Sequence, residues 1–157
     1  MSHIATIDVS IMDLDSLEKA CANMGLVLVR GQVKYHCWGT GRTLDQLKKY
    51  QAMSGKALMP EGYSLEEMGR CDHVVRVPGK HGYEIGLVAR KDGRVGWNLF
   101  CDLSGAHDIV EKCGKNLEKL RQNYAVEVAK RAAKRAGYRL VKTVFNTNGS
   151  ISLVTQK

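Results

Sequence analysis

Residues 83–102 read YEIGLVARKDGRVGWNLFCD, two apolar segments separated by a turn signal. The segments at 83–90 and 94–102 are rich in the aliphatic and aromatic side chains that favour strands. Between them, Asp92-Gly93 tolerates the positive φ angles of a hairpin turn. Gly86, inside the first segment, indicates a bulge or the close approach of another part of the chain. These features predict a β-hairpin at the centre of the fold.

Strand patterns flank this hairpin on both sides. Residues 73–77 end at the turn signal Pro78-Gly79, so we expect them to extend the hairpin into a meander. The remaining strands are expected at residues 3–11, 26–30, about 33–38, and in a last hairpin of 138–145 with 150–156 joined through Asn148-Gly149.

Two stretches have the periodicity of amphipathic helices. The first is expected to start at Asp15, with Glu18 in the capping-box position, and to end at Gly25. The second covers about residues 107–136 and has a helix breaker at Gly114. Its buried stripe is expected to consist of Leu117, Leu120, Tyr124, Val128 and Ala132.

This order of elements predicts an α+β fold. We expect a mainly antiparallel sheet with a β-meander, two or more helices packed on it, and a small helical insertion. Two helix–glycine–strand units, ending in strands 26–30 and 138–145, would surround the meander. The chain of 157 residues suits one domain, 1–157. Residues 39–70, rich in glycine and holding two capping-box spacings, are interpreted as a helical insertion or flap within it.

Composition excludes several classes of protein. The apolar fraction of 44% and the charged fraction of 25% are ordinary for a globular chain and exclude a disordered tail or a collagen-like repeat. The longest apolar run, residues 26–29, is far short of a membrane span. The start of the chain lacks the pattern of a secretory signal, so we expect a cytoplasmic protein.

The net charge of +8 is concentrated at the C-terminal end. Residues 111–157 carry eleven basic and three acidic residues, whereas residues 1–30 carry two basic and four acidic ones. A field concentrated in this way attracts polyanions or an acidic partner. The alternative is a solvated helix face that keeps the protein soluble.

The strongest candidate site is a cluster of cations in the second helix and the strand after it. Lys130, Arg131, Lys134 and Arg135 share one arc of the helix, opposite its alanines. Arginine and lysine are the side chains suited to phosphate and carboxylate. We expect glutamine at all four positions to leave folding nearly intact, and we expect Glu127 to pair with Arg131 if the face is merely solvated. The anion-binding candidates are therefore Lys130, Arg131, Lys134, Arg135, Arg139 and Lys142.

A second candidate lies in the glycine-rich segment. Gly39, Gly41, Arg42 and Thr43 precede an expected helix, whose N-terminal N–H groups could bind phosphate. The segment lacks the Gly-Lys-Ser/Thr ending of a P-loop, and a flexible hinge is the alternative. A ligand pocket under the 39–70 flap could also use Arg42, His36 and Asp102.

Other residues give weaker hypotheses. Tyr35, Trp38, Trp97 and Phe100 could stack on bases, although the core needs most of the aromatic side chains. Glu84 and Asp102 could form an acid–base pair, although carboxylates on a solvent-facing sheet surface are commoner.

No catalytic motif is present, so an enzyme is the less favoured hypothesis. No pattern indicates a cofactor or a metal. The five cysteines are odd in number and widely spaced, which favours reduced thiols in the core. They are Cys21, Cys37, Cys71, Cys101 and Cys113.

Six blocks of the sequence occur in an order that is typical of one family. The blocks are residues 1–7, 17–20 with Gly25, 83–86, 92–93, 102–105 and 122–126. Together they resemble a DUF1257-like family of conserved reading frames, similar to the hypothetical chloroplast protein 35 and found in plastids, cyanobacteria, other bacteria and phages. Leu87 and Ser104 depart from the aromatic residues usual at those places, and residues 39–70 look inserted relative to short members. The resemblance implies a small soluble α+β protein of the bacterial or phage-infected cytoplasm, or of the plastid stroma. It also implies a gene sometimes beside that of an AAA-type ATPase, and it implies no catalytic residues.

Three functions remain open at this point. The first is a non-enzymatic basic binding or adaptor protein, whose C-terminal third engages nucleic acid, a nucleotide or an acidic protein surface. The second is a nucleotide-binding protein or enzyme with a pocket under the 39–70 flap. The third is a structural subunit of a complex with an AAA-type ATPase.

Overall fold

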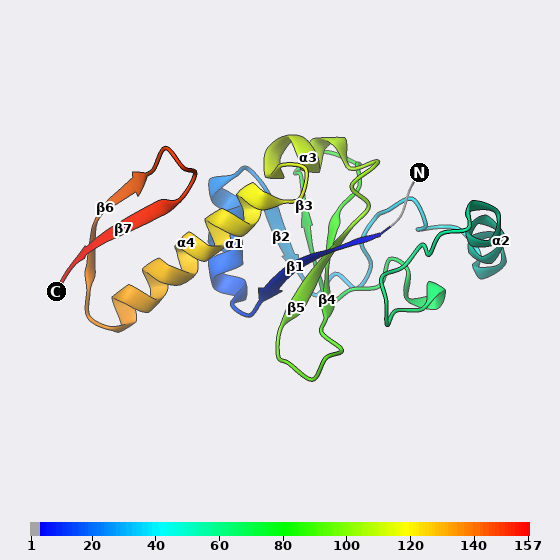
Figure 1. The fold of residues 1–157 in the computed structure, drawn as a ribbon, viewed down its shortest axis with the longest axis horizontal. Helices are drawn as coiled ribbons and strands as arrows, with labels where there is room; N and C mark the ends of the chain where they lie inside the picture. Colours follow the sequence, from blue (N-terminus) through cyan, green and yellow to red (C-terminus); the bar gives the residue numbers. More distant parts are fainter. Residues whose placement is uncertain (1–3) are drawn as a thin grey trace.

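The computed structural model describes residues 4–157 and has an α+β architecture. A five-stranded antiparallel sheet, of strand order β1-β5-β4-β3-β2, occupies its centre (Figure 1). Its strands are β1 (Ala5–Ile11), β2 (Val27–Arg30), β3 (His73–Arg76), β4 (Ile85–Ala89) and β5 (Trp97–Cys101). The remaining elements are α1 (Leu14–Asn23), α2 (Leu44–Ser54), the 3-10 turn η1 (Leu65–Glu67), α3 (His107–Cys113), α4 (Glu118–Arg135), β6 (Arg139–Phe145) and β7 (Ile151–Gln156).

The expected meander forms the middle of the sheet. Strands β3, β4 and β5 are neighbours, with Leu87 opposite Leu99 and Gly86 opposite Phe100. The prediction of a close approach at Gly86 is confirmed, because a Cβ there would lie 2.2 Å from Cδ1 of Tyr35. The aromatic ring of Tyr35 therefore packs directly on the sheet backbone.

The two faces of the sheet carry different cores. On one face α1, α3 and α4 bury a large cluster in which Leu17, Leu99 and Leu120 are fully enclosed. On the other face the segment that links β2 to β3 supplies a smaller cluster around Tyr35 and Phe100. The helical segment α2 extends beyond this second layer (Figure 1), and Leu47 is its buried residue. Helices and sheet thus pack as expected for an α+β protein.

Several local expectations are wrong. Residues 33–38 do not form a strand; a single antiparallel bridge joins Lys34 to Arg70. Helix α1 begins earlier than expected, because the Asp13 carboxylate caps it by accepting hydrogen bonds from the backbone N–H groups of Asp15 and Ser16. Ala132 is exposed, so the buried stripe of α4 ends before it.

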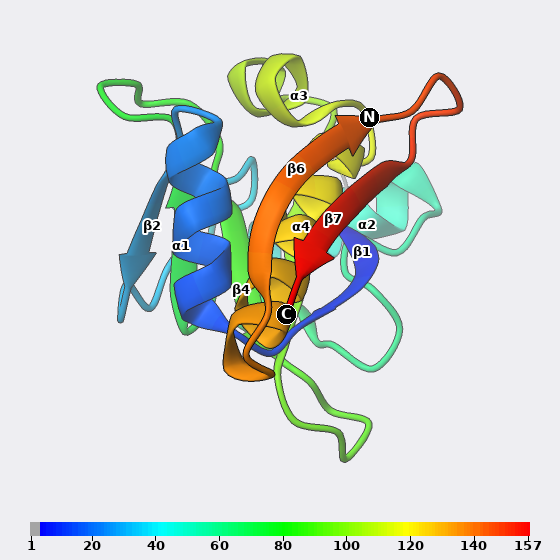
Figure 2. The same cartoon turned by 90° about the vertical axis from the view of Figure 1, so that its left-hand side faces the viewer.

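The last hairpin is not part of the central sheet. Strands β6 and β7 form a separate two-stranded sheet, so the expected second helix–glycine–strand unit does not feed the meander. Gly137, with φ of +82°, ends α4 and turns the chain back, and the hairpin then runs alongside that helix (Figure 2). Within residues 4–157, no helix is long and apolar enough to cross a membrane.

Candidate functional site

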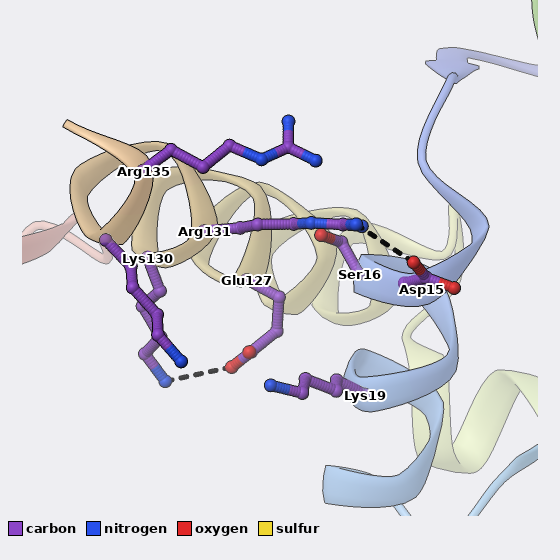
Figure 3. A pocket seen from close by; sticks show the side chains of 8 residues that line it. Asp15, Ser16, Lys19, Glu127, Lys130, Arg131 and Arg135 are labelled. Carbon is purple, nitrogen blue, oxygen red and sulfur yellow. Dashed lines mark hydrogen bonds and ion pairs between the residues drawn. The ribbon is translucent and has the colours of Figure 1, made fainter.

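A cleft of about 640 Å³ lies between α1 and the second half of α4 (Figure 3). All four cations predicted on α4 border it, and Lys19 of α1 adds a fifth. Two carboxylates, Asp15 and Glu127, also border the cleft, so its walls carry an excess of positive charge. The full lining is Asp15, Ser16, Lys19, Glu127, Lys130, Arg131, Lys134 and Arg135.

The Tyr124 hydroxyl fixes the start of α1 against α4. It accepts hydrogen bonds from the backbone N–H groups of Met12, at 3.0 Å, and Asp13, at 3.2 Å. The Tyr124 ring belongs to the same core cluster as Leu17 and Cys21 of α1. Tyr124, predicted as a core residue of α4, therefore also holds the start of α1 at one edge of the cleft.

Arg131 connects the two helices and is not free to bind a ligand. Its guanidinium forms ion pairs with Asp13 and, at 3.0 Å, with Asp15. Burial alone would raise the pKa of Asp13, but the hydrogen bonds from Ser16 and Arg131 outweigh it and hold that pKa below its usual value. Hydrogen bonds from Arg30 and then Arg131 likewise lower the pKa of Asp15. Arg131 is therefore part of the wall of the cleft.

Lys130 is also engaged within the protein. Its ammonium group lies 2.8 Å from the carboxylate of Glu127, which is only 8% exposed and also accepts a hydrogen bond from Asn23. The expected pairing of Glu127 with Arg131 is thus replaced by a pairing with Lys130. Removal of Lys130 would leave a buried carboxylate short of its cation, which is costly. The expectation that glutamine at all four positions leaves folding nearly intact stays a prediction, and the ion pairs of Lys130 and Arg131 argue against it at those two positions.

Three cations of the cleft remain available to a ligand. Lys19, Lys134 and Arg135 are exposed, and none of them forms an ion pair with a side chain that the structure describes. In Figure 3 the Lys19 side chain points from α1 toward α4, and the Arg135 side chain reaches toward α1. Sequence reasoning missed Lys19, because nothing in the local pattern places α1 beside α4.

Arg139 and Lys142 lie outside the cleft, on β6. They belong to a longer segment, residues 128–157, which we call the C-terminal arm and which comprises the end of α4 and the β6–β7 hairpin. The arm contains seven cations and no Asp or Glu. It also exposes a group of large apolar side chains: Tyr138, Leu140, Val141, Phe145 and Val154.

The second predicted site forms a smaller pocket of about 360 Å³. Gly39, Gly41 and Arg42 line it, whereas the Thr43 hydroxyl is used in the capping box that starts α2. Lys34 and Arg70, which the sequence did not single out, line the same pocket. Neither His36 nor Asp102 lines it, so this pocket does not combine them with Arg42.

The proposed stacking residues are mostly committed elsewhere. Tyr35 and Phe100 are buried in the smaller core cluster. The Trp97 indole N–H donates to the Asp72 carboxylate at 2.8 Å. The Arg42 guanidinium lies 4.1 Å from the centre of the Trp38 ring, which also contacts Tyr50. These rings are therefore not an open stacking surface.

The two carboxylates considered as an acid–base pair have separate structural roles. Glu84 accepts hydrogen bonds from the His36 backbone N–H, at 2.8 Å, and from Gln32. Asp102 is fully buried, contrary to the expected solvent-facing position, and accepts a hydrogen bond from the Ser104 hydroxyl at 2.7 Å. They share no hydrogen-bond partner and so do not form a dyad.

The five cysteines are free and buried, as expected for core thiols. Burial raises the pKa of Cys21 and of Cys71 to about 12. A thiol with such a pKa is protonated at neutral pH and is a poor nucleophile. In the described part of the chain, no group of three or more His, Cys, Asp or Glu side chains could hold a metal ion.

Comparison with known families adds one finding. A family model described as "Protein of unknown function (DUF1257)" matches residues 43–154. The match includes α2, the meander, α4 and most of the β6–β7 hairpin. No curated protein and no solved structure matches the chain.

Proposed function

Because the chain belongs to the DUF1257 family of proteins of unknown function, we propose a function from the geometry of its site. We propose that it is a non-enzymatic binding protein that engages nucleic acid through the α1–α4 cleft and the C-terminal arm. The five free, buried cysteines support placing this activity in the reducing cytoplasm.

The distribution of charge is the observation that carries this proposal. Residues 128–157 include seven Lys or Arg and no Asp or Glu. Lys134 and Arg135 of this segment, together with Lys19, are free of ion pairs among the described side chains. An excess of cations concentrated in one segment is the electrostatic footprint expected of a protein that binds phosphate backbones.

The geometry of the β6–β7 hairpin also suits nucleic acid. A two-stranded ribbon is one of the elements that the major groove of DNA admits. In this ribbon Arg139 lies opposite Gln156, and Lys142 opposite Val154. In a regular strand, residues three apart point to opposite faces. Because of the register shift between Leu140 and Lys142, Arg139 and Lys142 lie opposite residues that are two apart on β7, so both cations point to the same face of the ribbon. The ribbon thus presents two cations side by side.

An acidic protein surface is the second candidate partner. The exposed apolar side chains of the arm favour it, because Phe145 is 77% exposed and Val141 is 55% exposed. The AAA-type ATPase implied by the family resemblance would be such a partner. Exposed apolar groups add little to contacts with phosphates, so the two candidates differ in which arm residues they require.

Titration of labelled 20-base-pair duplex DNA and of single-stranded RNA at two salt concentrations tests the proposal. Binding to the nucleic acid that is recognised should weaken steeply with salt, with a log–log slope of about −0.9 for each neutralised phosphate of duplex DNA. The informative variant is Lys19→Gln/Lys134→Gln/Arg135→Gln, because it removes only cations that lack ion pairs. We expect it to fold normally and to bind at least about tenfold more weakly, with a shallower slope.

The matched control removes three charges from the opposite end of the molecule. Lys48→Gln/Lys49→Gln/Lys56→Gln changes exposed lysines on and just after α2, far from the arm (Figure 1). This variant should bind nearly as tightly as the parent. Equal weakening in both variants would show that only net charge matters. Undetectable binding of either nucleic acid at low salt would remove the proposal and leave the acidic protein surface.

A further inference from the structure

We propose that the pocket bordered by Lys34, Arg42 and Arg70 binds the phosphate group of a small ligand. This site is separate from the α1–α4 cleft, and the inference does not depend on nucleic-acid binding there. The three cations come from distant parts of the sequence, and the fold brings them to one pocket of about 360 Å³.

Two of these cations are held opposite each other. Lys34 and Arg70 are partners in an antiparallel bridge, flanked by hydrogen bonds from Tyr35 N–H to Gly69 O, at 2.8 Å, and from Cys71 N–H to Val33 O, at 3.1 Å. Side chains of directly opposed residues emerge on the same face, with Cβ atoms about 5 Å apart. Like charges in this position are destabilising unless an anion lies between them. The bridge therefore places two like charges on one face, where a bound phosphate would contact both.

The protein itself does not neutralise this charge. None of Lys34, Arg42 and Arg70 forms an ion pair with a side chain that the structure describes. Glu66 is the carboxylate that lines the pocket, and its pKa is lowered by its own backbone N–H, by Ser64 and by Lys48. None of these groups is Lys34, Arg42 or Arg70, so the ionised Glu66 is stabilised by other partners than the three cations.

Hydrogen bonds and close packing hold the wall of the pocket, which disfavours the alternative of a flexible hinge at residues 39–43. The Thr40 hydroxyl donates to Tyr35 O at 3.0 Å and accepts from the Cys37 N–H at 3.1 Å. A Cβ at Gly39 would lie 1.7 Å from Sδ of Met68, so this loop is packed tightly against the segment that carries Arg70. A preformed site loses less free energy on ordering when a ligand binds.

Arg42 is held in a defined position at the edge of the pocket. Its guanidinium stacks on Trp38, with 4.1 Å to the ring centre, and its Nε donates to Trp38 O at 3.2 Å. The planar guanidinium is the group best suited to phosphate oxygens, and stacking restricts its motion. A volume of about 360 Å³ is at the lower end of small-ligand pockets, which favours a compact phosphorylated molecule.

Inorganic pyrophosphate is a suitable probe for this site. We expect pyrophosphate to raise the Tm of the parent protein more than sodium chloride at matched ionic strength, and to bind in calorimetric titration. Lys34→Gln/Arg70→Gln should weaken this binding at least about tenfold. Without ligand, the variant should melt no lower than the parent, because it removes two opposed like charges. Arg42→Gln supplies an independent test that leaves the bridge unchanged.

Control variants locate the effect. Lys49→Gln/Lys56→Gln should keep the response to pyrophosphate, and so should the cleft variant Lys19→Gln/Lys134→Gln/Arg135→Gln. The proposal is overturned if pyrophosphate gives no stabilisation beyond sodium chloride, or if Lys34→Gln/Arg70→Gln responds like the parent. Loss of the response in the cleft variant would place the anion in the α1–α4 cleft. Displacement of pyrophosphate by duplex DNA in the cleft variant would identify the phosphate as that of a nucleic-acid backbone and would also overturn the small-ligand site.

Discussion

The two phenylalanines of this chain lie in regions that differ in how far they bury their side chains. Phe100, in the central sheet, is 1% exposed and packs in a closed core, whereas Phe145, in the C-terminal arm, is 77% exposed. The charges differ in the same way: Arg30 on β2 pairs with Asp15 and Glu18, while Lys134 on the arm has no such partner among the described side chains. In the sheet region, Phe100 and Arg30 have their partners within the protein. The arm leaves apolar and cationic groups for something else to contact.

The β6–β7 hairpin of the arm is also weakly attached. It packs against α4 and forms a sheet of two strands only. A two-stranded hairpin is marginal in water without a further surface to pack on. The Gln122 side chain donates to Gly149 O, which ties the hairpin turn to the beginning of α4. We therefore expect the sheet to determine global stability and the arm to determine binding.

The largest expected contrast is between the two phenylalanines. Phe100→Ala should lower the free energy of unfolding by about 3–5 kcal/mol, because it leaves a cavity in a closed core. Phe145→Ala should change it by no more than about 0.5 kcal/mol, as at other exposed positions. Urea unfolding of the two variants measures both values. Similar losses for the two would show that the arm is part of the cooperative core.

Two glycines provide an intermediate contrast. Gly86→Ala should destabilise by about 1–3 kcal/mol, because the new methyl group would overlap the ring of Tyr35, which is fully buried. Gly149→Ala meets open space but has φ of +82°, which costs about 1 kcal/mol of local strain. Since the hairpin can open locally, we expect thermal unfolding to detect the change at Gly86 and barely that at Gly149. A larger loss of thermal stability in Gly149→Ala than in Gly86→Ala would contradict the expectation that the sheet determines global stability.

The smallest expected effect lies where the two regions join. Asp13→Asn retains a good N-cap for α1 but removes the charge that pairs with Arg131. Because this pair is partly exposed, its loss should cost less than about 1 kcal/mol at pH 7. The pKa of Asp13 is lower in the folded protein, so its contribution is complete above the unfolded pKa of about 3.9 and disappears as the pH falls through the folded value.

The stability of parent and Asp13→Asn, followed by urea unfolding between pH 7 and pH 2, should therefore converge below about pH 4. Arg131→Gln should behave similarly, because it removes the other half of the pair. A difference between parent and variant that stays constant over this range would show that Asp13 acts only as a helix cap.

Local signals predicted most of the fold. Asp92-Gly93, Gly25 and the Thr43 capping box mark turns and helix ends through backbone preferences that act within a few residues. Residues 33–38 have the alternation of a strand because Tyr35 and Cys37 pack in the smaller core, but their pairing is limited to the single bridge between Lys34 and Arg70. Alternating burial does not require a ladder of hydrogen bonds.

The candidate sites were predictable only in part. The four cations on α4 share a face by helical periodicity, and the structure brings all four to one cleft. Their pairing with Asp13 and Glu127 depends on how α1 packs against α4, which no local pattern specifies. Lys19, Lys34 and Arg70 were missed for the same reason, because each reaches its site through tertiary contacts.

Hydrogen–deuterium exchange with and without the 20-base-pair duplex tests the central claim most directly. In the free protein, amides of β6 and β7 should exchange much faster than those of β4 and β5, because local opening of the hairpin leaves the sheet intact. Added duplex should slow exchange in the hairpin and the second half of α4 and leave the meander unchanged. A hairpin as protected as the meander in the free protein, or protection by duplex that falls only outside the cleft and arm, would contradict the account.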